Sequence, residues 1–400
     1  MFRLSSSVFS ALVLSAVAAF AYDPTRSDNL VVYWGQNSYG ATHGSDVPSW
    51  QQTISNYCQD TCIDVIPIAF IDSFSGGIPD LNLGNESSFP YSICNDNGVS
   101  GSCASLAAGI QACQAKGKLV TLSLGGGGTT TARFGSDAAA ISFADTIWND
   151  FLGGSSGAHR PFGAAVLDGV DLDIESGNNT GYAAFANRIR TLWAGASKPY
   201  YLTAAPQCPS LTHGSGTPSA LHGSTLSMFN STTRKIINSG VKSYPSPNWN
   251  FATWNTWAQG APNPNVKIFI GAPASPTAAN SGEYVSASNL GSIALATRAV
   301  FSNFGGVMLW DASQAYGKFD SAIKNILTGT NNCGATGGSG GGGPGSGGGG
   351  GCTQTYTVKD GDTCLDIESR TGVTVAQLHA LNPAINSDCT NLIGGQILCV

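Results

Sequence analysis

The sequence predicts an α/β protein, a (β/α)8 barrel followed by a small domain in which two helices lie between two strands (βααβ). Short apolar runs recur through most of the chain, separated by stretches long enough for a helix. This alternation is typical of a parallel sheet that helices cover on both sides. The composition then breaks at a glycine-rich stretch, which indicates a flexible linker. We therefore expect a barrel at 22–332, a linker at 333–351 and a terminal domain at 352–400.

The apolar runs define the expected strands and the end at which a site would form. They lie at 29–34, 63–70, 119–124, 166–174, 201–205, 266–270 and 306–310. Polar or glycine residues follow five of them: Gly35, Gln36 and Asn37; Gly125 to Gly128; Glu175; Pro206 and Gln207; and Asp311. Active sites of such barrels lie at the carboxyl ends of the strands, so these residues should converge.

Three acidic residues alternate with aliphatic ones in the fourth of these runs. Asp171, Asp173 and Glu175 fall on one face of a strand, and each is about 7 Å from the next along the strand. The other face is wholly apolar and should be buried. Stacked carboxyl groups in a buried strand are unfavourable as structure alone, because they repel one another and resist ionisation. Such perturbed acids are typical of catalytic sites.

Two other interpretations of these acids are a calcium or magnesium site and an acidic strand end that faces solvent. Hard cations do favour clustered carboxylates. Calcium loops, however, are polar throughout and lack a continuous apolar partner face. We therefore expect no metal and no cofactor.

The run DGVDLDIE at 168–175 resembles the DxxDxDxE signature of family 18 glycoside hydrolases, the chitinases. The resemblance implies that Glu175 is the general acid and base. It also implies that Asp173 holds the N-acetyl group of the substrate and that Asp171 shares a proton with Asp173. In this family the acetamido oxygen of the sugar is the nucleophile. Nearby carboxylates would raise the pKa of Glu175 and keep it protonated.

Four further segments resemble the hevamine-like, plant and fungal class III branch of that family. They are YWGQN at 33–37, LSLGG at 122–126, YLTAAPQCP at 201–209 and GGVMLW at 305–310. The resemblance implies that substrate contacts come from Tyr33, Gln36, Gly125, Gly126, Gln207 and Trp310. Trp310 would form a floor under the sugar or fill the core, and Tyr33 would line the pocket or fill the barrel. The two glycines would allow close approach of the sugar or simply form a tight turn.

The sixth strand of the barrel is doubtful. No apolar run of strand length lies between Pro209 and Val266, where the family has a strand whose tyrosine braces the reaction intermediate. Eleven cysteines are an odd number, and none lies between Cys208 and Cys333, where the resemblance implies a partner for Cys208. Either a segment at 229–249 has been replaced, through a frame shift or altered splicing, or the chain has diverged. Tyr244 is the nearest tyrosine, and we assign it no role.

Composition and the N-terminal residues indicate a secreted protein. Residues 1–21 have a positive charge, an apolar stretch and a small-residue cleavage site, as a signal peptide does. Only 10% of residues are charged and the net charge is −6, which disfavours nucleic acids and anionic membranes as partners. Three glycosylation sequons begin at Asn85, Asn178 and Asn230, and we expect no use of the second. We expect a monomer that is extracellular or associated with a cell wall.

The terminal residues resemble the LysM module, a βααβ fold that binds N-acetylglucosamine polymers. The match rests on YTVKDGDT at 356–363, LNP at 381–383 and GQ at 395–396, with Leu365, Ile367, Leu378 and Leu381 as apolar helix positions. Cys352, Cys364, Cys389 and Cys399 would supply two disulfides to a thin core. The resemblance implies chitin binding by Gly361, Asp362, Thr363, Asn382, Pro383, Ala384 and Ile385. Otherwise these seven are only turn residues.

The resulting prediction is a secreted endochitinase that cleaves β-1,4 links between N-acetylglucosamine units with retention. One alternative is a chitin-binding protein whose catalysis is impaired by the altered sixth-strand region. Another is a muramidase-like or glycan-trimming hydrolase with the same mechanism. The expected partner in the first two cases is chitin or another N-acetylglucosamine polymer.

Overall fold

The structure is a computed structural model. It describes residues 22–74, 79–83, 104–127, 132–156, 160–175, 179–206, 234–237, 241, 244–245, 249–261, 263–278, 284–315, 319–330, 333, 354–359, 362–382, 385, 389, 392 and 397–400. The expected signal peptide, nearly all of the expected linker and the asparagines of the three sequons lie outside these residues.

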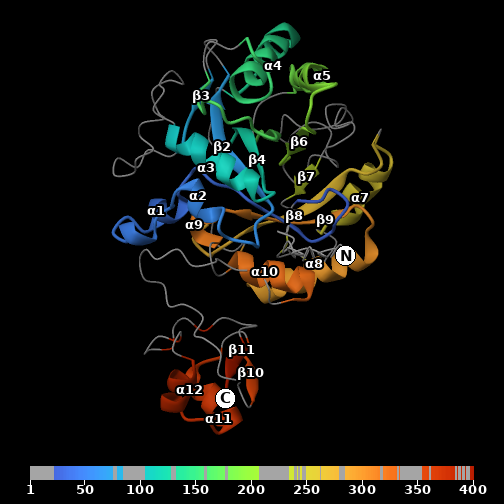
Figure 1. Cartoon of the computed structure of the whole chain (residues 1–400). Coiled ribbons are helices and arrows are strands. Elements are labelled where there is room, and N and C mark those ends of the chain that lie inside the picture. The colour runs from blue at the N-terminus through green and yellow to red at the C-terminus, as the bar shows by residue number, and fades with distance from the viewer. Residues whose placement is uncertain are drawn as a thin grey trace, which may run out of the picture.

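Parallel strands close into a barrel, as the alternation of apolar runs predicts (Figure 1). The strands are β1 (Asn29–Val32), β2 (Val65–Ser73), β4 (Leu119–Gly125), β5 (Gly169–Asp173), β6 (Tyr201–Ala204), β7 (Arg234–Ile237), β8 (Lys267–Pro273) and β9 (Phe304–Trp310). Each pairs with its neighbour in parallel, and β1 pairs with both β9 and β2, which closes the barrel. A short strand, β3 (Asp80–Leu81), runs antiparallel beside β2.

The doubt about the sixth strand is resolved by β7. Its backbone pairs in parallel with β6 through Arg234 and Lys235, and with β8 along its whole length from Arg234 to Ile237. The strand that the sequence left in doubt is therefore present, between β6 and β8. A strand of four residues needs no long apolar run, because neighbours on both sides supply its backbone hydrogen bonds. The segment just before it, and Cys208, lie outside the described residues.

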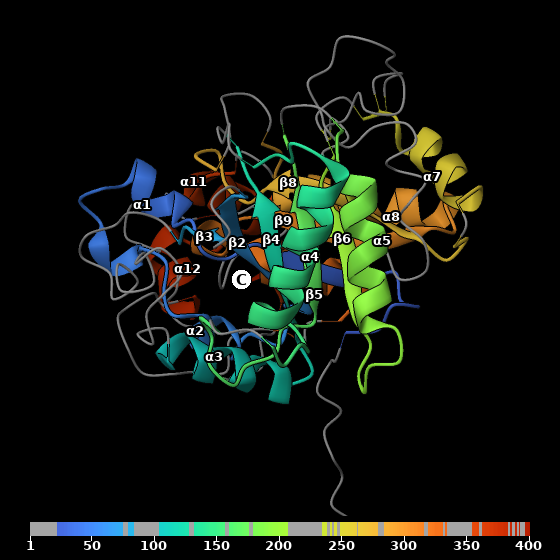
Figure 2. The ribbon, with the colours of Figure 1, turned by 90° about the horizontal axis from the view of Figure 1, so that it is seen from above.

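Helices surround the strands, and Figure 2 shows α3, α4, α5 and α7 around them. The elements of this layer are α1 (Ser38–Thr42), a 3-10 helix (Val47–Ser49), α2 (Ile54–Tyr57), α3 (Ala104–Ala115), α4 (Asp137–Phe151), α5 (Tyr182–Trp193), α7 (Phe251–Gln259), α8 (Ala287–Val300), α9 (Ala312–Ala315) and α10 (Phe319–Thr328). Serine caps start the two longest, since the Ser136 and Ser286 hydroxyls accept hydrogen bonds from backbone N–H groups of the first turns.

Two apolar layers result from the alternation of side chains along each strand. On β5, Val170, Leu172 and the following Ile174 point outward into the core beneath the helices. The alternate residues of the strands point into the barrel, where Tyr33 and Phe70 belong to a smaller apolar cluster. The prediction that the aliphatic face of the acidic run is buried is therefore confirmed. Its three acids face the barrel interior.

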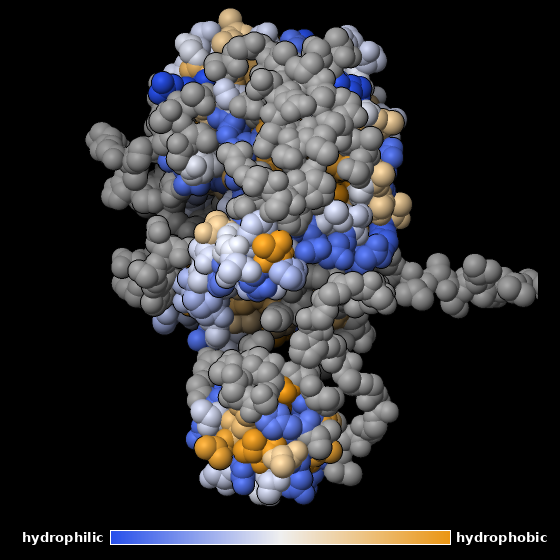
Figure 3. All heavy atoms as spheres, turned by 90° about the vertical axis from the view of Figure 1, so that its left-hand side faces the viewer, coloured by the Kyte–Doolittle hydropathy of each residue, from blue (hydrophilic) through white to orange (hydrophobic). Residues whose placement is uncertain are grey.

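The terminal domain has the predicted βααβ order. Its elements are β10 (Thr355–Thr357), α11 (Cys364–Thr371), α12 (Val375–Leu381) and β11 (Ile397–Cys399), with the two strands antiparallel. Ile367 and Leu378 lie in its core as expected. Leu365 and Leu381, the other two predicted apolar helix positions, are 70% and 50% exposed. Figure 3 shows apolar side chains on the surface of this domain.

Disulfide bonds tie parts of each domain together. Cys58 bonds to Cys113, and Cys62 bonds to Cys333, so the first residue of the expected linker is joined to the barrel. In the terminal domain Cys364 bonds to Cys389, and Cys399 is also disulfide-bonded. Within the described part of the chain, no helix is both long and apolar enough to cross a bilayer.

Candidate active site

Asp171 is the first acid of the row, lies in the middle of β5 and is fully buried. Three hydroxyl groups from neighbouring strands surround its carboxyl group. The Tyr33 and Ser123 hydroxyls each donate to Oδ2 at 2.7 Å, and the Thr203 hydroxyl donates to Oδ1. The donors come from the end of β1, from β4 and from β6. Closure of the barrel is therefore what brings residues 138 positions apart onto one carboxyl group.

Burial and these hydroxyls act on the pKa of Asp171 in opposite directions. Burial is the larger effect and raises the pKa of the carboxyl group, while the hydrogen bonds from Thr203, Tyr33 and Ser123 limit that rise. All three donors favour the ionised form, because each donates a hydrogen bond to a carboxyl oxygen and such bonds are stronger when that oxygen is charged. Burial and the negative charge of Asp171 in turn hold the pKa of the Tyr33 hydroxyl well above its usual value, so Tyr33 remains a donor.

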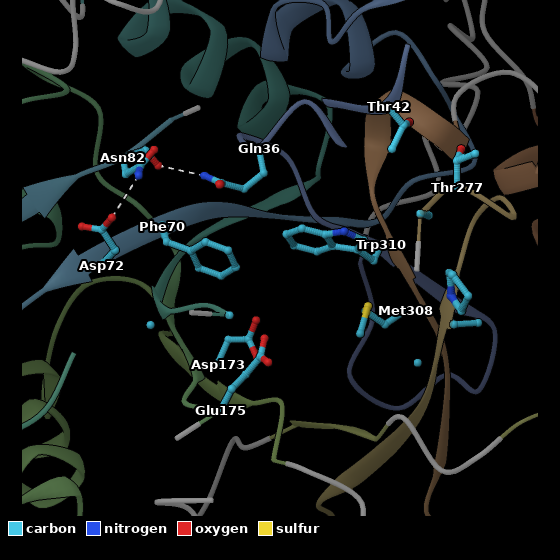
Figure 4. Close-up of a pocket in the computed structure, with 16 residues that line it drawn as sticks. Gln36, Thr42, Phe70, Asp72, Asn82, Asp173, Glu175, Thr277, Met308 and Trp310 are labelled. Atoms are coloured by element: carbon cyan, nitrogen blue, oxygen red, sulfur yellow. Dashed lines mark hydrogen bonds between the residues drawn. The ribbon is translucent and has the colours of Figure 1, made fainter. Parts of the chain in front are cut away.

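Asp173 and Glu175 lie side by side in the cleft above (Figure 4). Burial holds the pKa of Asp173 well above its usual range, and the charges of Asp171 and Glu175 add to this effect. Burial also raises the pKa of Glu175. The predicted direction for Glu175 is confirmed, but the cause is burial rather than nearby carboxylates. Asp171 receives its hydrogen bonds from hydroxyls in this conformation, and no bond to Asp173 accompanies them.

The cleft has a volume of about 690 Å³. Two aromatic rings lie across it from the acids, and the rings of Phe70 and Trp310 are nearly parallel with centroids 5.8 Å apart (Figure 4). Trp310 is partly exposed to the cleft, as the floor interpretation requires. Tyr33 is buried, with its ring centroid 5.6 Å from that of Trp310. It supports the site from within the barrel and does not line the cleft.

The two predicted glycines allow close packing within the protein more than close approach of the sugar. Both have positive φ, +112° at Gly125 and +91° at Gly126. A Cβ atom on Gly125 would lie 2.3 Å from the backbone oxygen of Asp173, and one on Gly126 would lie 2.6 Å from the ring of Phe70. Gly125 lines the cleft, whereas Gly126 packs against Phe70. Neither interpretation made from the sequence included these strand and ring contacts.

Gln36 lines the cleft with its amide fixed in place. Its Nε2 donates to the backbone oxygens of Ala69 at 2.9 Å and Asn82 at 3.0 Å, and the Asn82 side chain donates to Asp72 at 2.9 Å (Figure 4). Gln36 is thus brought to the site as predicted. Gln207 lies outside the described residues.

Several cleft or supporting residues were not predicted. They are Phe70, Asp72, Asn82, Ser123, Gly127, Thr203 and Met308. Four had a signal in the sequence, because Ser123 lies within LSLGG, Thr203 within YLTAA, Met308 within GGVMLW and Gly127 within the run of glycines at 125–128. Phe70 ends an apolar run and resembles a core residue, while Asn82 follows the separate strand β3, which the sequence did not suggest.

The first acid of the DxxDxDxE run lies away from the cleft. Asp168 accepts hydrogen bonds from the backbone N–H of Val120 at 2.8 Å, from Gln114 at 2.9 Å and from Lys198 at 2.8 Å. It precedes β5, so it sits at the opposite end of the strand from Glu175. Its contacts are those of a residue that joins β4 and β5 at the base of the barrel.

The predicted sugar-binding residues of the terminal domain have structural contacts where they are described. Asp362 accepts hydrogen bonds from the Tyr356 hydroxyl at 2.8 Å and from Arg370. The Thr363 side chain caps α11, and Asn382 exchanges two hydrogen bonds of 2.8 Å with the backbone of Cys399. Ile385 is buried. Gly361, Pro383 and Ala384 lie outside the described residues.

With this geometry in view, comparison with known proteins places the barrel in a family. Residues 29–297 match the model of glycosyl hydrolases family 18, and residues 356–400 match that of the LysM domain. The chain belongs to glycosyl hydrolase family 18. It is 37% identical to an endochitinase of Saccharomyces cerevisiae, over 79% of this chain and 53% of that one. It is 36% identical to endochitinase 33 of Trichoderma harzianum, over 79% of this chain and 96% of that one.

Solved structures also resemble the barrel. The ICChI chitinase of Ipomoea carnea matches with a TM-score of 0.58 and 29% identity, over 74% of this chain and 99% of that one. The xylanase and α-amylase inhibitor XAIP-II of Scadoxus multiflorus matches with a TM-score of 0.55 and 27% identity, over 76% of this chain and 98% of that one. The chain spans little more than half the length of the first curated relatives that it matches.

Proposed function

We propose that this protein is a secreted endochitinase that cleaves β-1,4 links between N-acetylglucosamine units with retention of configuration. The observation that carries the proposal is the contrast among three acids on one strand. Burial raises the pKa of all three, but Asp171 lies beneath the cleft with three hydroxyl donors on its carboxyl group, while Asp173 and Glu175 line the cleft, and the pKa of Asp173 is raised the further by the charges of its two neighbours. Different environments for neighbouring acids suit different roles.

In the first step Glu175 protonates the leaving glycosidic oxygen. The bond from that oxygen to the anomeric carbon breaks, and the acetamido oxygen of the same sugar forms a bond to the anomeric carbon from the other side. The product is a cyclic oxazolinium ion. Asp173 accepts a hydrogen bond from the acetamido N–H, which orients the group and stabilises its developing positive charge. No carboxylate of the protein bonds to the sugar.

In the second step Glu175, now ionised, accepts a proton from water. That water attacks the anomeric carbon and opens the oxazolinium ring, so two inversions give net retention. The proton taken from water returns Glu175 to its acid form, which closes the cycle. The negative charge of Asp171 helps Asp173 to keep its proton in the free protein. The apolar face of the sugar packs on Trp310.

The LysM domain would hold the protein on chitin. Tethering the barrel to a bound module raises the local concentration of substrate around the cleft without any new contact in the cleft itself. Support for this role comes from the domain match at 356–400 and from the intact βααβ fold. The side chains of Asp362 and Asn382 already hold hydrogen bonds within the domain. Backbone groups of the loops that follow β10 and α12 would therefore make the sugar contacts.

The test is cleavage of soluble N-acetylglucosamine oligomers by the wild type and by Glu175→Gln. We expect mass spectrometry to find shorter oligomers with the wild type, and we expect a loss of about 100-fold to 10,000-fold in kcat with the variant. Asp145→Asn is the matched control, since Asp145 pairs with Arg188 on the helix surface. Equal cleavage by wild type and Glu175→Gln would refute the proposal.

A second candidate function is chitin binding without cleavage. The fold alone permits it, because the XAIP-II structure carries this fold under the name of an inhibitor. The strand β7 weakens the original reason for this candidate. Chitin pull-down of the wild type without any released oligomer would favour it over the enzyme.

A further inference from the structure

Asp311 directly follows Trp310 and is completely buried. Its Oδ1 accepts hydrogen bonds from the hydroxyls of Ser38 at 2.8 Å and Ser313 at 2.6 Å, and its Oδ2 accepts one from the backbone N–H of Ser38 at 3.1 Å. A buried carboxyl group that accepts three hydrogen bonds holds the donor residues in place. Movement of any donor would leave a buried polar group without its partner.

These bonds join the loops that follow the first and last strands of the barrel. Ser38 is the first residue of α1, after β1, and Ser313 lies in α9, after β9. Two further hydrogen bonds join the same loops. The backbone N–H of Tyr39 donates to the Ser313 hydroxyl at 3.0 Å, and the backbone N–H of Ala312 donates to the backbone oxygen of Tyr33 at 2.8 Å. The end of β9 is therefore held to the start of α1 at the point where the barrel closes.

Gln314 extends the link to the loop after β8. Its Nε2 donates to the Ser38 hydroxyl at 3.1 Å. Its Oε1 accepts hydrogen bonds from the hydroxyls of Thr277 at 2.7 Å and of Ser275. We call the linked set the hydroxyl network, and its members are Ser38, Ser275, Thr277, Asp311, Ser313 and Gln314.

The hydroxyl network lies directly behind one part of the cleft. Trp310 precedes Asp311, Thr42 ends the helix that Ser38 begins, and Thr277 is itself a member; all three line the cleft (Figure 4). We propose that Asp311 is a positioning residue which, through the hydroxyl network, holds Trp310 and the wall of Thr42 and Thr277 in the arrangement that binds sugar. The inference rests on the proposed function.

This role predicts an effect on substrate affinity and not on bond breaking. Asp311 is not among the residues that line the cleft, and its donors differ from those of Asp171. In Asp311→Asn the amide keeps the shape of the side chain but replaces one acceptor oxygen with a donor. At least one network donor then loses its acceptor, and the loops after β1 and β9 can separate.

The experiment measures KM, kcat and the pH–rate profile of Asp311→Asn on soluble N-acetylglucosamine oligomers. We expect KM to rise about tenfold while kcat changes less than about threefold, with an unchanged pH profile. Asp168→Asn is the matched control, a substitution of a hydrogen-bonded acid at the other end of the barrel, and should leave KM as in the wild type. A fall in kcat with KM unchanged, or a lower melting temperature alone, would overturn the inference.

Milder variants keep the test informative if Asp311→Asn does not fold. Ser313→Ala removes two bonds of the network, one to Asp311 and one from Tyr39, and should raise KM by a few-fold. Ser313→Thr keeps the hydroxyl and should restore the wild-type KM. Equal KM values for Ser313→Ala and Ser313→Thr would count against the inference.

Failure of the proposed function gives a different result. If the wild type cleaves no oligomer, the chitinase proposal falls, and calorimetric affinity of the barrel for the same oligomers becomes the readout. Weaker binding by Asp311→Asn than by Asp168→Asn would still support the positioning role. Equal binding by the two variants would refute it.

Discussion

The hydroxyl of Tyr33 donates a 2.7 Å hydrogen bond to Asp171, linking the end of the first barrel strand to the middle of the acidic strand. Tyr33 is buried and packs against Trp310, with ring centroids 5.6 Å apart and the ring planes tilted by 54°. One side chain therefore contacts both the buried acid Asp171 and the aromatic floor of the cleft. The sequence alone left open whether Tyr33 lines the pocket or fills the barrel, and the structure gives it this supporting position.

We predict that Tyr33→Phe lowers kcat by about tenfold to 100-fold, because Asp171 loses one donor to its charged form. The sugar would still pack on Trp310, so KM should change little. Tyr182→Phe is the control, since it removes a buried hydroxyl that donates to the Ala132 oxygen at 2.8 Å. Similar kcat values for the two variants in steady-state assays would contradict the role of Tyr33.

Asp173→Asn should lower activity and stabilise the protein at neutral pH. The folded-state pKa of Asp173 lies well above the ordinary value of 3.8, so its stability contribution is full below that value and is lost as pH rises through the folded pKa. The variant avoids that loss. Thermal unfolding should show Asp173→Asn melting a few degrees above the wild type at pH 7, with the difference disappearing near pH 3. A variant that melts lower at pH 7 would contradict the raised pKa.

The alkaline limb of the activity profile should reflect Glu175. Catalysis needs this acid protonated, and burial raises its pKa above the ordinary value of 4.5. Activity on oligomers should therefore persist at pH values above 4.5 and decline as the group loses its proton. Gly127→Ala tests this assignment, because the added Cβ atom would lie 3.2 Å from Glu175 Oε1. The added methyl group would exclude water from the carboxyl group and raise its pKa further. We expect its alkaline limb to move upward.

Asp168→Asn should act on stability and not on catalysis. Its carboxyl group joins Val120 and Lys198 at the base of the barrel, so the variant should lose about 1–3 kcal/mol in the free energy of unfolding. Activity at a temperature well below melting should match the wild type. Denaturant unfolding and an activity assay on the same preparation measure the two effects, and a large loss of kcat would give Asp168 a catalytic role.

Asn382→Ala should lower the stability of the LysM domain without removing a direct contact to the sugar. The side chain exchanges two hydrogen bonds with Cys399 on strand β11, so its loss frees the closing strand. Chitin pull-down at rising temperature should show binding lost several degrees earlier than in the wild type, with equal binding in the cold. Loss of binding at all temperatures would indicate that Asn382 contacts the sugar.

The sequence predicted the parts of the fold that have long-range regularity. The alternation of acids and aliphatic residues in the fourth run fixes which face of β5 is buried, and the repeated apolar runs indicate the barrel. It could not reveal β7, because a strand of four residues between two partners depends on their backbone and not on its own hydrophobicity. The same limit applies to Leu365, whose helical spacing fits a core position although it faces solvent.

Of the site, Gln36, Gly125, Asp173, Glu175 and Trp310 were predicted, and the structure brings them to one cleft with the predicted Asp171 buried beneath it. The supporting contacts depend on residues far apart in sequence. Thr203 and Ser123 reach Asp171 only because β4 and β6 flank β5, and Phe70 enters the cleft through the packing of β2. The hydroxyl network behind Trp310 has the same origin, since three separate loops contribute to it.

The central claim is that the substrate's own acetamido group attacks the anomeric carbon while this row of acids supplies and accepts protons. Its most direct test is the rate of cleavage of N-acetylglucosamine hexamer against that of the glucose hexamer with the same β-1,4 links. The account predicts cleavage of the first, with the β-anomer as initial product by NMR, and none of the second. Comparable rates on the two hexamers would contradict it.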